Sequence, residues 1–299
     1  MEYKTRSVPK ELQILEVLHT RMELQEHDRQ RYLSLKKGLE GELLFDSHTR
    51  QLNLDCLVIN DLLLQINNIT FQIDTLLIAD AIYFYEIKNF EGDFYLKDNR
   101  LYNNLNFELN NPLTQLTRTE SLLRQLLQSL GINTNIHSFV VFINPEFTLF
   151  QAPIDKPIIL PTQINRYMKR LNSLNSKITQ KHKTLANKLI SLHLEQSPYT
   201  KLPDYTYEHL KKGIVCHICK SFDINVEGRS CICGKCGNTQ LVTETVLRSV
   251  EEFKLLFPEE KITTRGIHEW CRIFSKKRIS RILNSHFKSI GINRWVYFE

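Results

Sequence analysis

The chain has 299 residues, of which 42% are hydrophobic and 24% charged, and its formal net charge is +6. A chain of this length can bury a sizeable core in two or three domains. Because it contains no run of about 18 apolar residues and no apolar segment at its start, we expect no membrane span, no secretory leader and a cytoplasmic location.

The charge is distributed unevenly along the chain. Acidic residues outnumber basic ones in 41–155, whereas basic residues outnumber acidic ones in 156–243 and in 244–299. An acidic segment followed by a basic half suits a metal-dependent site coupled to modules that hold a polyanion. Mildly basic tails are common in proteins, so the charge alone discriminates little.

The first segment, 1–37, is charged and has leucines at helical spacing, so we predict an amphipathic helix that packs against the following domain. Gly38 and Gly41 then predict a turn that opens a new segment, in which Glu42 lies beside an apolar run. Hydrophobic and alternating patterns predict further strands at 54–65, 68–78, 93–97 and 100–104.

Two alternating stretches, Phe71–Ile78 and Ile82–Lys88, flank a connection short enough to close a β-hairpin. A pairing that is symmetric about Asp80 places Asp74 directly opposite Glu86. The Cβ atoms of directly opposed residues lie roughly 4.5–5.5 Å apart. The sequence therefore predicts two carboxylates side by side on one face of the hairpin.

Two carboxylates this close repel each other in an apolar setting unless a cation lies between them. Hard oxygen ligands of this kind suit Mg²⁺ or Mn²⁺. Lys88 follows Glu86 on the same face, where its ammonium can orient or activate a water. The alternative is a solvated Asp/Glu/Lys face on an ordinary hairpin, and the motif alone leaves both open.

The next elements complete an α/β pattern. Leu113 begins a helical stretch that ends at Gly131, as expected for a helix C-terminus. Ser138–Ile143 is a short apolar strand reached after a helix, which favours parallel pairing in a mixed sheet. A basic helical stretch at 162–196 is most simply a solvated face that links or braces the domains.

Several short motifs, taken in order, resemble the NERD (nuclease-related) domain: Gly41-Glu42, Gln72-Ile73-Asp74, Glu86-Ile87-Lys88-Asn89, Gly92, Asn111-Pro112-Leu113-x-Gln115 and Val140-Val141-Phe142. This family is similar to the PD-(D/E)xK nuclease superfamily, close to the Mrr-type and archaeal junction-resolving enzymes. The resemblance covers roughly residues 38–150. Ile73 stands where the superfamily usually has proline, a departure that many relatives share.

The resemblance implies a mixed sheet flanked by helices and a role for each motif residue. Asp74 and Glu86 would ligate Mg²⁺ or Mn²⁺, and Glu42 would complete the site directly or through water. Lys88 would position or deprotonate the attacking water, and Gln115 would orient the scissile phosphate or the nucleophile. The implied reaction is hydrolysis of a phosphodiester bond.

Five of the seven cysteines lie in one short segment, which argues for a metal in a chain without a signal sequence. Cys216 and Cys219 form one C-x2-C knuckle, and Cys233 and Cys236 form a second. Four thiolates complete a tetrahedral zinc ribbon. Cys231 is an alternate for Cys233, which we favour because C-x2-C-G gives the usual knuckle geometry.

The last segment predicts three helices, at 243–256, 264–271 and 276–288, and a closing strand at Arg294–Phe298. Their order resembles a helix–turn–helix of winged-helix type, whose recognition helix enters the DNA major groove. The alternative is a small helical domain with a basic surface. The basic residues near the start of the third helix are the DNA-binding candidates: Lys276, Lys277, Arg278 and Arg281.

The favoured function is a metal-dependent deoxyribonuclease that the zinc ribbon and the helix–turn–helix-like module deliver to DNA. The alternative is a non-catalytic DNA-binding or regulatory protein that keeps the nuclease-like scaffold. RNA as substrate and homodimerisation stay open. The expected segments are an N-terminal helix at 1–37, the nuclease-like domain at 38–153, a basic helical linker at 154–212, the zinc ribbon at 213–242 and the helix–turn–helix-like domain at 243–299.

Overall fold

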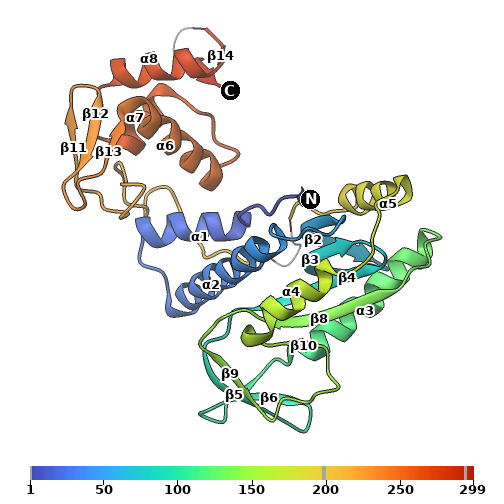
Figure 1. Cartoon of the computed structure of the whole chain (residues 1–299). Coiled ribbons are helices and arrows are strands. Elements are labelled where there is room, and N and C mark those ends of the chain that lie inside the picture. Colours follow the sequence, from blue (N-terminus) through green and yellow to red (C-terminus); the bar gives the residue numbers. More distant parts are fainter. Residues whose placement is uncertain (1, 197–199, 293–294) are drawn as a thin grey trace. The chain divides into compact units, whose positions relative to one another are not determined.

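A computed structural model describes residues 2–196, 200–292 and 295–299 of the chain (Figure 1). The chain divides into two compact units. Among the described residues, no helix combines the length and the apolar character needed to cross a membrane.

Each unit is assembled from two separate stretches of the chain. Unit 1 contains Met1–Lys10 and Leu33–Lys201, and unit 2 contains Glu11–Tyr32 and Leu202–Glu299. The helix α2, Glu26–Thr49, contributes residues to both. The N-terminal residues therefore belong to the same unit as the central domain.

Unit 1 is built on a six-stranded mixed sheet with the order β1-β2-β3-β4-β8-β10. The neighbours β2, β3 and β4 pair antiparallel, and the pairs β1–β2, β4–β8 and β8–β10 are parallel. The parallel pairing predicted for the strand after the long helix is thus confirmed. The strand bounds are β1 Glu2–Lys4, β2 Leu57–Ile66, β3 Ile69–Ile78, β4 Ile82–Lys88, β8 Ile136–Phe142 and β10 Ile158–Ile159.

A smaller sheet extends the same unit, with the order β7-β6-β5-β9. The rings of Phe142 and Phe147 stack at the junction between the two sheets with centroids 4.0 Å apart, and the Phe94 ring packs tilted against Phe147 at 5.3 Å. Aromatic stacking of this kind fixes the orientation of one sheet against the other. The bounds are β5 Gly92–Lys97, β6 Arg100–Asn103, β7 Glu108–Leu109 and β9 Phe147–Phe150.

Helices cover both faces of the six-stranded sheet (Figure 1). Leu123 of α3 and Leu189 of α5 lie in one buried cluster, and Phe45 of α2 and Met168 of α4 lie in the other. The mixed sheet flanked by helices that we predicted is confirmed. The helix bounds are α3 Pro112–Ser129, α4 Ile164–Asn172 and α5 Gln180–Ser191, with the 3-10 turn η1 Pro161–Gln163 before α4.

The turn predicted at Gly38 and Gly41 is wrong, because α2 continues through both glycines. A Cβ atom on Gly41 would lie 2.6 Å from Cβ of Asn89, closer than real Cβ contacts. Gly41 therefore serves the close approach of the helix to the end of β4 rather than a turn. Residues before it form β1, the helix α1 (Lys10–Arg21) and the first part of α2.

The predicted hairpin register is confirmed over the pairs from Ile78↔Ile82 to Thr75↔Tyr85. The strict alternation of faces is not, because Ile73 and Leu76 point into the same buried cluster. The break coincides with Asp61 on β2, which has φ 55° and is skipped in the β2–β3 ladder. Asp74, which lies opposite Asp61 in this register, is skipped as well, so the ladder is interrupted in both strands at this point.

Unit 2 combines a three-stranded antiparallel sheet with a small helical domain around one core. Trp270, which is fully buried, lies at its centre, and the Arg21 guanidinium stacks 4.1 Å from the Trp270 ring. Arg21 also binds Glu252 at 2.7 Å, so this buried cation is paired. The bounds are β11 Ile224–Glu227, β12 Ser230–Cys233, β13 Thr239–Leu241, α6 Val242–Leu256, α7 Thr264–Cys271, α8 Lys276–His286, β14 Ser289–Ile290 and β15 Tyr297–Phe298.

The three helices predicted for the last segment are present as α6, α7 and α8. Thr263 caps α7 by accepting from the Gly266 amide, and Ser275 caps α8 by accepting from the Arg278 amide. β14 pairs with β15 after α8, as a wing would. Arg294, the start of the predicted closing strand, lies outside the described residues.

Candidate metal and catalytic site

The β3–β4 hairpin carries two buried acids, Asp74 on β3 and Glu86 on the neighbouring strand β4. Asp74 is 8% exposed and Glu86 is 3% exposed. Oδ2 of Asp74 accepts a hydrogen bond of 2.8 Å from the Ile87 amide, so this carboxylate lies against β4 next to Glu86. The β3–β4 ladder ends at Thr75↔Tyr85, so Asp74 and Glu86 each lie one residue beyond its last pair.

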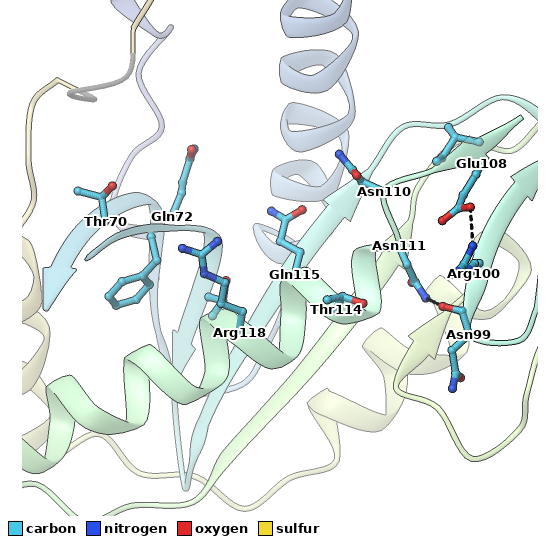
Figure 2. Close-up of a pocket in the computed structure, with 13 residues that line it drawn as sticks. Thr70, Gln72, Asn99, Arg100, Glu108, Asn110, Asn111, Thr114, Gln115 and Arg118 are labelled. Carbon is cyan, nitrogen blue, oxygen red and sulfur yellow. Dashed lines mark hydrogen bonds and ion pairs between the residues drawn. The ribbon is translucent and has the colours of Figure 1, made fainter. Parts of the chain in front are cut away.

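Lys88 connects the hairpin to helix α3. Its Nζ lies 2.7 Å from Oε1 of Glu86 and donates to Oε1 of Gln115 at 3.2 Å. Gln115 projects from the first turn of α3 (Figure 2). The N-terminus of this helix is fixed by Asn111, whose side chain accepts from the Leu113 amide. Three of the predicted residues therefore form one connected chain of polar contacts.

Glu42 reaches the same region from α2, where it is held by an arginine that the sequence analysis missed. Arg6 NH1 lies 2.8 Å from Oε2 of Glu42, and the Arg6 side chain is only 2% exposed. The same guanidinium donates to the carbonyl oxygen of Asp74 at 2.7 Å and to Oγ1 of Thr75 at 3.1 Å. Arg6 therefore ties α2 to β3 at the position of Asp74.

Asp46, one helical turn after Glu42, completes this network. It is fully buried and accepts two hydrogen bonds of 3.0 Å from the Nε and NH2 atoms of Arg6. Bidentate pairing of this kind is the strongest form of carboxylate–guanidinium contact. Two acids spaced four apart on one helix face repel each other, but this pattern does not identify Arg6 as their partner, since Arg6 lies far away along the chain.

The site concentrates negative charge in a buried setting. Burial raises the pKa of Glu42 to about 8, the charge of Asp74 adds to this, and Arg6 opposes it. Burial and the charge of Asp74 raise the pKa of Glu86 to about 7, against the pull of Lys88. Burial also raises the pKa of Asp74, against the Ile87 amide, Lys88 and Arg6.

These acids have the chemistry that a hard divalent cation requires. Carboxylate oxygens are the preferred ligands of Mg²⁺ and Mn²⁺, and a dication would favour the ionised carboxylates against the burial that raises all three pKa values. The carboxylate oxygens of Glu42, Asp74 and Glu86 do not form a compact cluster. Among the described residues, only a four-cysteine set has three or more such ligand atoms all within 4.8 Å of one another. The carboxylate chemistry suits such an ion, and Asp74 and Glu86 lie on neighbouring strands, but the oxygens of Glu42, Asp74 and Glu86 do not all lie that close together.

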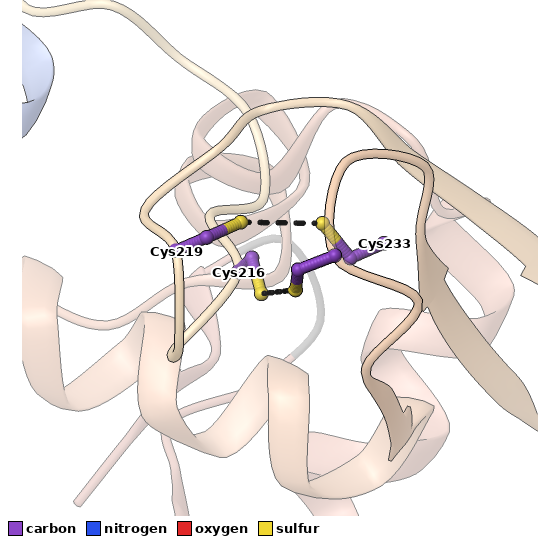
Figure 3. Close-up of side chains that lie close together, drawn as sticks. Cys216, Cys219 and Cys233 are labelled. Carbon is purple, nitrogen blue, oxygen red and sulfur yellow. Dashed lines mark hydrogen bonds between the residues drawn. The ribbon is translucent and has the colours of Figure 1, made fainter.

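That four-cysteine set consists of the residues predicted as zinc ligands: Cys216, Cys219, Cys233 and Cys236. The Sγ atoms of Cys216 and Cys236 are 3.7 Å apart, and those of Cys219 and Cys233 are 3.5 Å apart. Figure 3 shows the thiols of the two knuckles facing each other. Gly237 follows the second knuckle with φ 72°, a conformation that glycine adopts without strain. The geometry is consistent with a zinc ribbon.

Cys231 lies outside this set. Its side chain is buried in the core of unit 2, and burial raises the pKa of its thiol, which disfavours the thiolate that zinc requires. The preference for Cys233 over Cys231 agrees with this arrangement.

The basic residues of α8 are arranged along its exposed side. Lys276, Lys277 and Arg281 are exposed. Arg278 is half-buried and donates to the Gly228 carbonyl oxygen at 2.7 Å, so it braces the turn between β11 and β12. Three of the four predicted DNA-binding residues are therefore available at the surface.

Comparison with known proteins gives one match. The family model described as the nuclease-related domain, NERD, matches residues 37–143. No curated protein and no solved structure matches the chain. The matched segment contains the hairpin acids, Lys88, Glu42 and Gln115, and it is shorter than half of the chain. Residues 37–143 of this chain therefore form a nuclease-related domain, followed by a four-cysteine cluster of the kind found in zinc ribbons.

Proposed function

We propose that this protein is a metal-dependent nuclease that hydrolyses phosphodiester bonds of DNA. The observation that carries the proposal is the connected set of Glu86, Lys88 and Gln115, with the Asp74 carboxylate bonded to the Ile87 amide of the same strand as Glu86, all within the nuclease-related domain. Burying two carboxylates on neighbouring strands has a desolvation cost, which a purely structural hairpin has no need to bear. Raised pKa values at such a cluster are typical of functional sites.

In this proposal, Asp74 and Glu86 hold Mg²⁺ or Mn²⁺, and Glu42 completes the site directly or through water. The bound ion supplies charge compensation at the phosphate and lowers the pKa of water. Lys88 Nζ, fixed between Glu86 and Gln115, holds the attacking water or takes its proton. The Gln115 amide orients the phosphate, and its position is set by the capped first turn of α3.

The two C-terminal elements of unit 2 would bring the chain to DNA. Zn²⁺ held by the four cysteines would fix the ribbon, since small metal domains fold on binding their metal. The exposed cations Lys276, Lys277 and Arg281 would contact phosphates or bases from α8. Arg278 supports this surface by its bond to the ribbon turn.

A second candidate function is a non-catalytic DNA-binding or regulatory protein. It is favoured by one observation, the pairing of Glu42 with Arg6 and of Glu86 with Lys88. Arg6 and Lys88 thus provide partner charges for Glu42 and Glu86 without a metal ion. A scaffold that has lost catalysis would need such pairing to keep its buried acids. The two candidates differ in whether a divalent ion makes the purified chain cleave DNA.

The test is incubation of the full chain with linear, circular, single-stranded and branched DNA in Mg²⁺, Mn²⁺ or EDTA. We expect cleavage in the metal buffers, none in EDTA, and none by Lys88→Ala. Lys97→Ala is the matched control, because Lys97 is an exposed lysine on β5 of the same unit. Equal cleavage by Lys88→Ala and the wild type would reject the site, and no cleavage by any form would favour the second candidate.

A further inference from the structure

A cavity of about 610 Å³ opens beside the candidate catalytic residues of unit 1. Gln115 lines it and also accepts from Lys88, which lies against Glu86. In Figure 2, Gln115 and Arg118 project from the first turns of α3, with Gln72 on one side and Asn99 on the other. The cavity therefore continues directly from the group that would face the scissile phosphate.

The lining has the chemistry of a nucleotide site. Asn110 and Gln72, whose Nε2 also donates to Asp61 at 3.0 Å, supply side-chain amides, which offer both donors and acceptors to the edge of a base. Phe71 and Leu109 supply the apolar part of the wall. Pockets that bind small molecules combine such apolar walls with a few placed polar groups and have volumes of about 300–1,000 Å³.

One arginine in this lining is available for a phosphate. Glu108 is the only acid among the lining residues, and Arg100 neutralises it at 3.1 Å. Arg118 is exposed and, in the part of the chain that the structure describes, has no acidic side chain within ion-pair distance. The cavity therefore has a net positive charge next to the reaction centre, which suits the backbone of a nucleic acid strand.

From these observations we infer that the cavity binds an unpaired nucleotide adjacent to the scissile phosphate. A paired, stacked base inside a duplex cannot enter a cavity of this size without leaving the stack. The substrates are then DNA strands with a single-stranded end, branch or extruded base, and intact blunt duplex is a poor substrate. The inference rests on the proposed nuclease function for the phosphate next to the cavity, whereas the binding preference can be measured separately.

The experiment compares a blunt duplex with the same duplex carrying a short single-stranded extension, both fluorescently labelled. Binding to the full chain is measured by anisotropy in EDTA, where cleavage is not expected. Any contact made by the rest of the chain enters both affinities alike, so their ratio isolates the contribution of the extension. We expect the extended duplex to bind about tenfold more tightly, as for one stacked or phosphate-bound nucleotide.

Arg118→Gln should remove most of this advantage and lower the salt dependence of binding to the extended duplex by about 0.7 in slope, as for one phosphate contact to a single strand. Arg124→Gln is the matched control, because Arg124 is exposed on the same helix, pairs with Glu120 at 2.9 Å and does not line the cavity. For Arg124→Gln, the ratio of the affinity for the extended duplex to that for the blunt duplex should equal the wild-type ratio.

Equal binding of both DNAs by the wild type, or equal losses in the two variants, would overturn the inference. Competition by a free mononucleotide as strong as that of the extended DNA would also overturn it, since the cavity would then be a small-molecule site. Parallel cleavage assays in Mn²⁺ separate the two proposals. Cleavage without preference for the extension rejects only the nucleotide site, and preferential binding without cleavage rejects only the nuclease function.

Discussion

The guanidinium of Arg6 lies in a bidentate contact with the carboxylate of Asp46, with two N–O distances of 3.0 Å, and both side chains are almost completely buried. Arg6 comes from the segment after β1, and Asp46 comes from α2. The pair also engages Glu42 and the backbone of Asp74. The geometry of the candidate site thus depends on a residue far from it in sequence.

Arg6→Ala should destabilise unit 1 by about 3–5 kcal/mol, because the buried acid Asp46 loses the cation that pairs with it. The free energy of unfolding is measured by urea denaturation followed by circular dichroism. Arg50→Ala is the control, since Arg50 makes an exposed ion pair with Glu2 and should leave the urea midpoint nearly unchanged. A similar shift of the urea midpoint in both variants would show that the buried Arg6–Asp46 pair contributes no more to stability than an exposed ion pair.

Stability should depend on pH through Glu42 and Glu86. In the unfolded chain these carboxyls ionise near their ordinary pKa of 4.5, whereas the folded protein keeps the proton of Glu42 up to a pKa of about 8 and that of Glu86 up to a pKa of about 7. The folded state therefore binds more protons in this window, so these groups stabilise it fully below pH 4.5 and lose their contribution as the pH rises to about 8. Urea titrations between pH 4 and about 9 follow this loss.

Glu42→Gln is the matched variant for the pH prediction. This variant should reduce the loss of unfolding free energy near pH 8, because the amide does not titrate. The loss caused by ionisation of Glu86 should remain. Mg²⁺ should raise the unfolding midpoint more at pH 8 than at pH 5, since the carboxylates must be ionised to bind it. An identical pH profile for the variant and the wild type would contradict the assignment to Glu42.

Lys88→Ala should reduce DNA cleavage about 100- to 10,000-fold, the range for loss of a group that handles a proton. Because Lys88 is partly exposed, the circular dichroism spectrum should be unchanged. Gln115→Ala should reduce cleavage less, since its amide orients groups and carries no charge. Cleavage is quantified as the initial rate on labelled DNA in Mn²⁺, with Lys97→Ala run beside it.

Zinc content separates Cys233 from Cys231. Cys233→Ala should bind little or no zinc, because one of four clustered thiols is lost. Cys231→Ala should keep one zinc ion per chain, since this thiol lies in the core away from the cluster. The metal is measured by elemental analysis of the purified proteins. Retention of zinc by the Cys233 variant together with its loss in the Cys231 variant would reverse the ligand assignment.

Replacing Lys276, Lys277 and Arg281 together by alanine should weaken DNA binding and lower the slope of log affinity against log salt by about three, if each contacts one phosphate. Lys254→Ala on α6 is a control for the loss of one exposed charge in the same unit. The slope is measured by fluorescence anisotropy over a salt series. An unchanged slope in the triple variant would remove α8 from the DNA interface.

Much of the hairpin could be predicted because strand pairing is local. The connection at Asp80 fixes the register of β3 against β4, and the ladder follows it to Thr75↔Tyr85. The change of face between Ile73 and Leu76 could not be predicted, since it coincides with the left-handed Asp61 on the neighbouring strand. Alternation in one strand carries no information about a distortion imposed by another.

The sequence by itself determined the segments with a fixed local rule: the hairpin register, the two cysteine knuckles and the capped helices of unit 2. It also identified the nuclease-related motifs in their order. Only the tertiary structure decided that Arg6 enters the acidic site, that α2 passes straight through Gly41, and that Gln115 joins Lys88 to a cavity. The physical reason is that these contacts join residues distant in sequence, whose meeting depends on the packing of the whole unit rather than on local propensity.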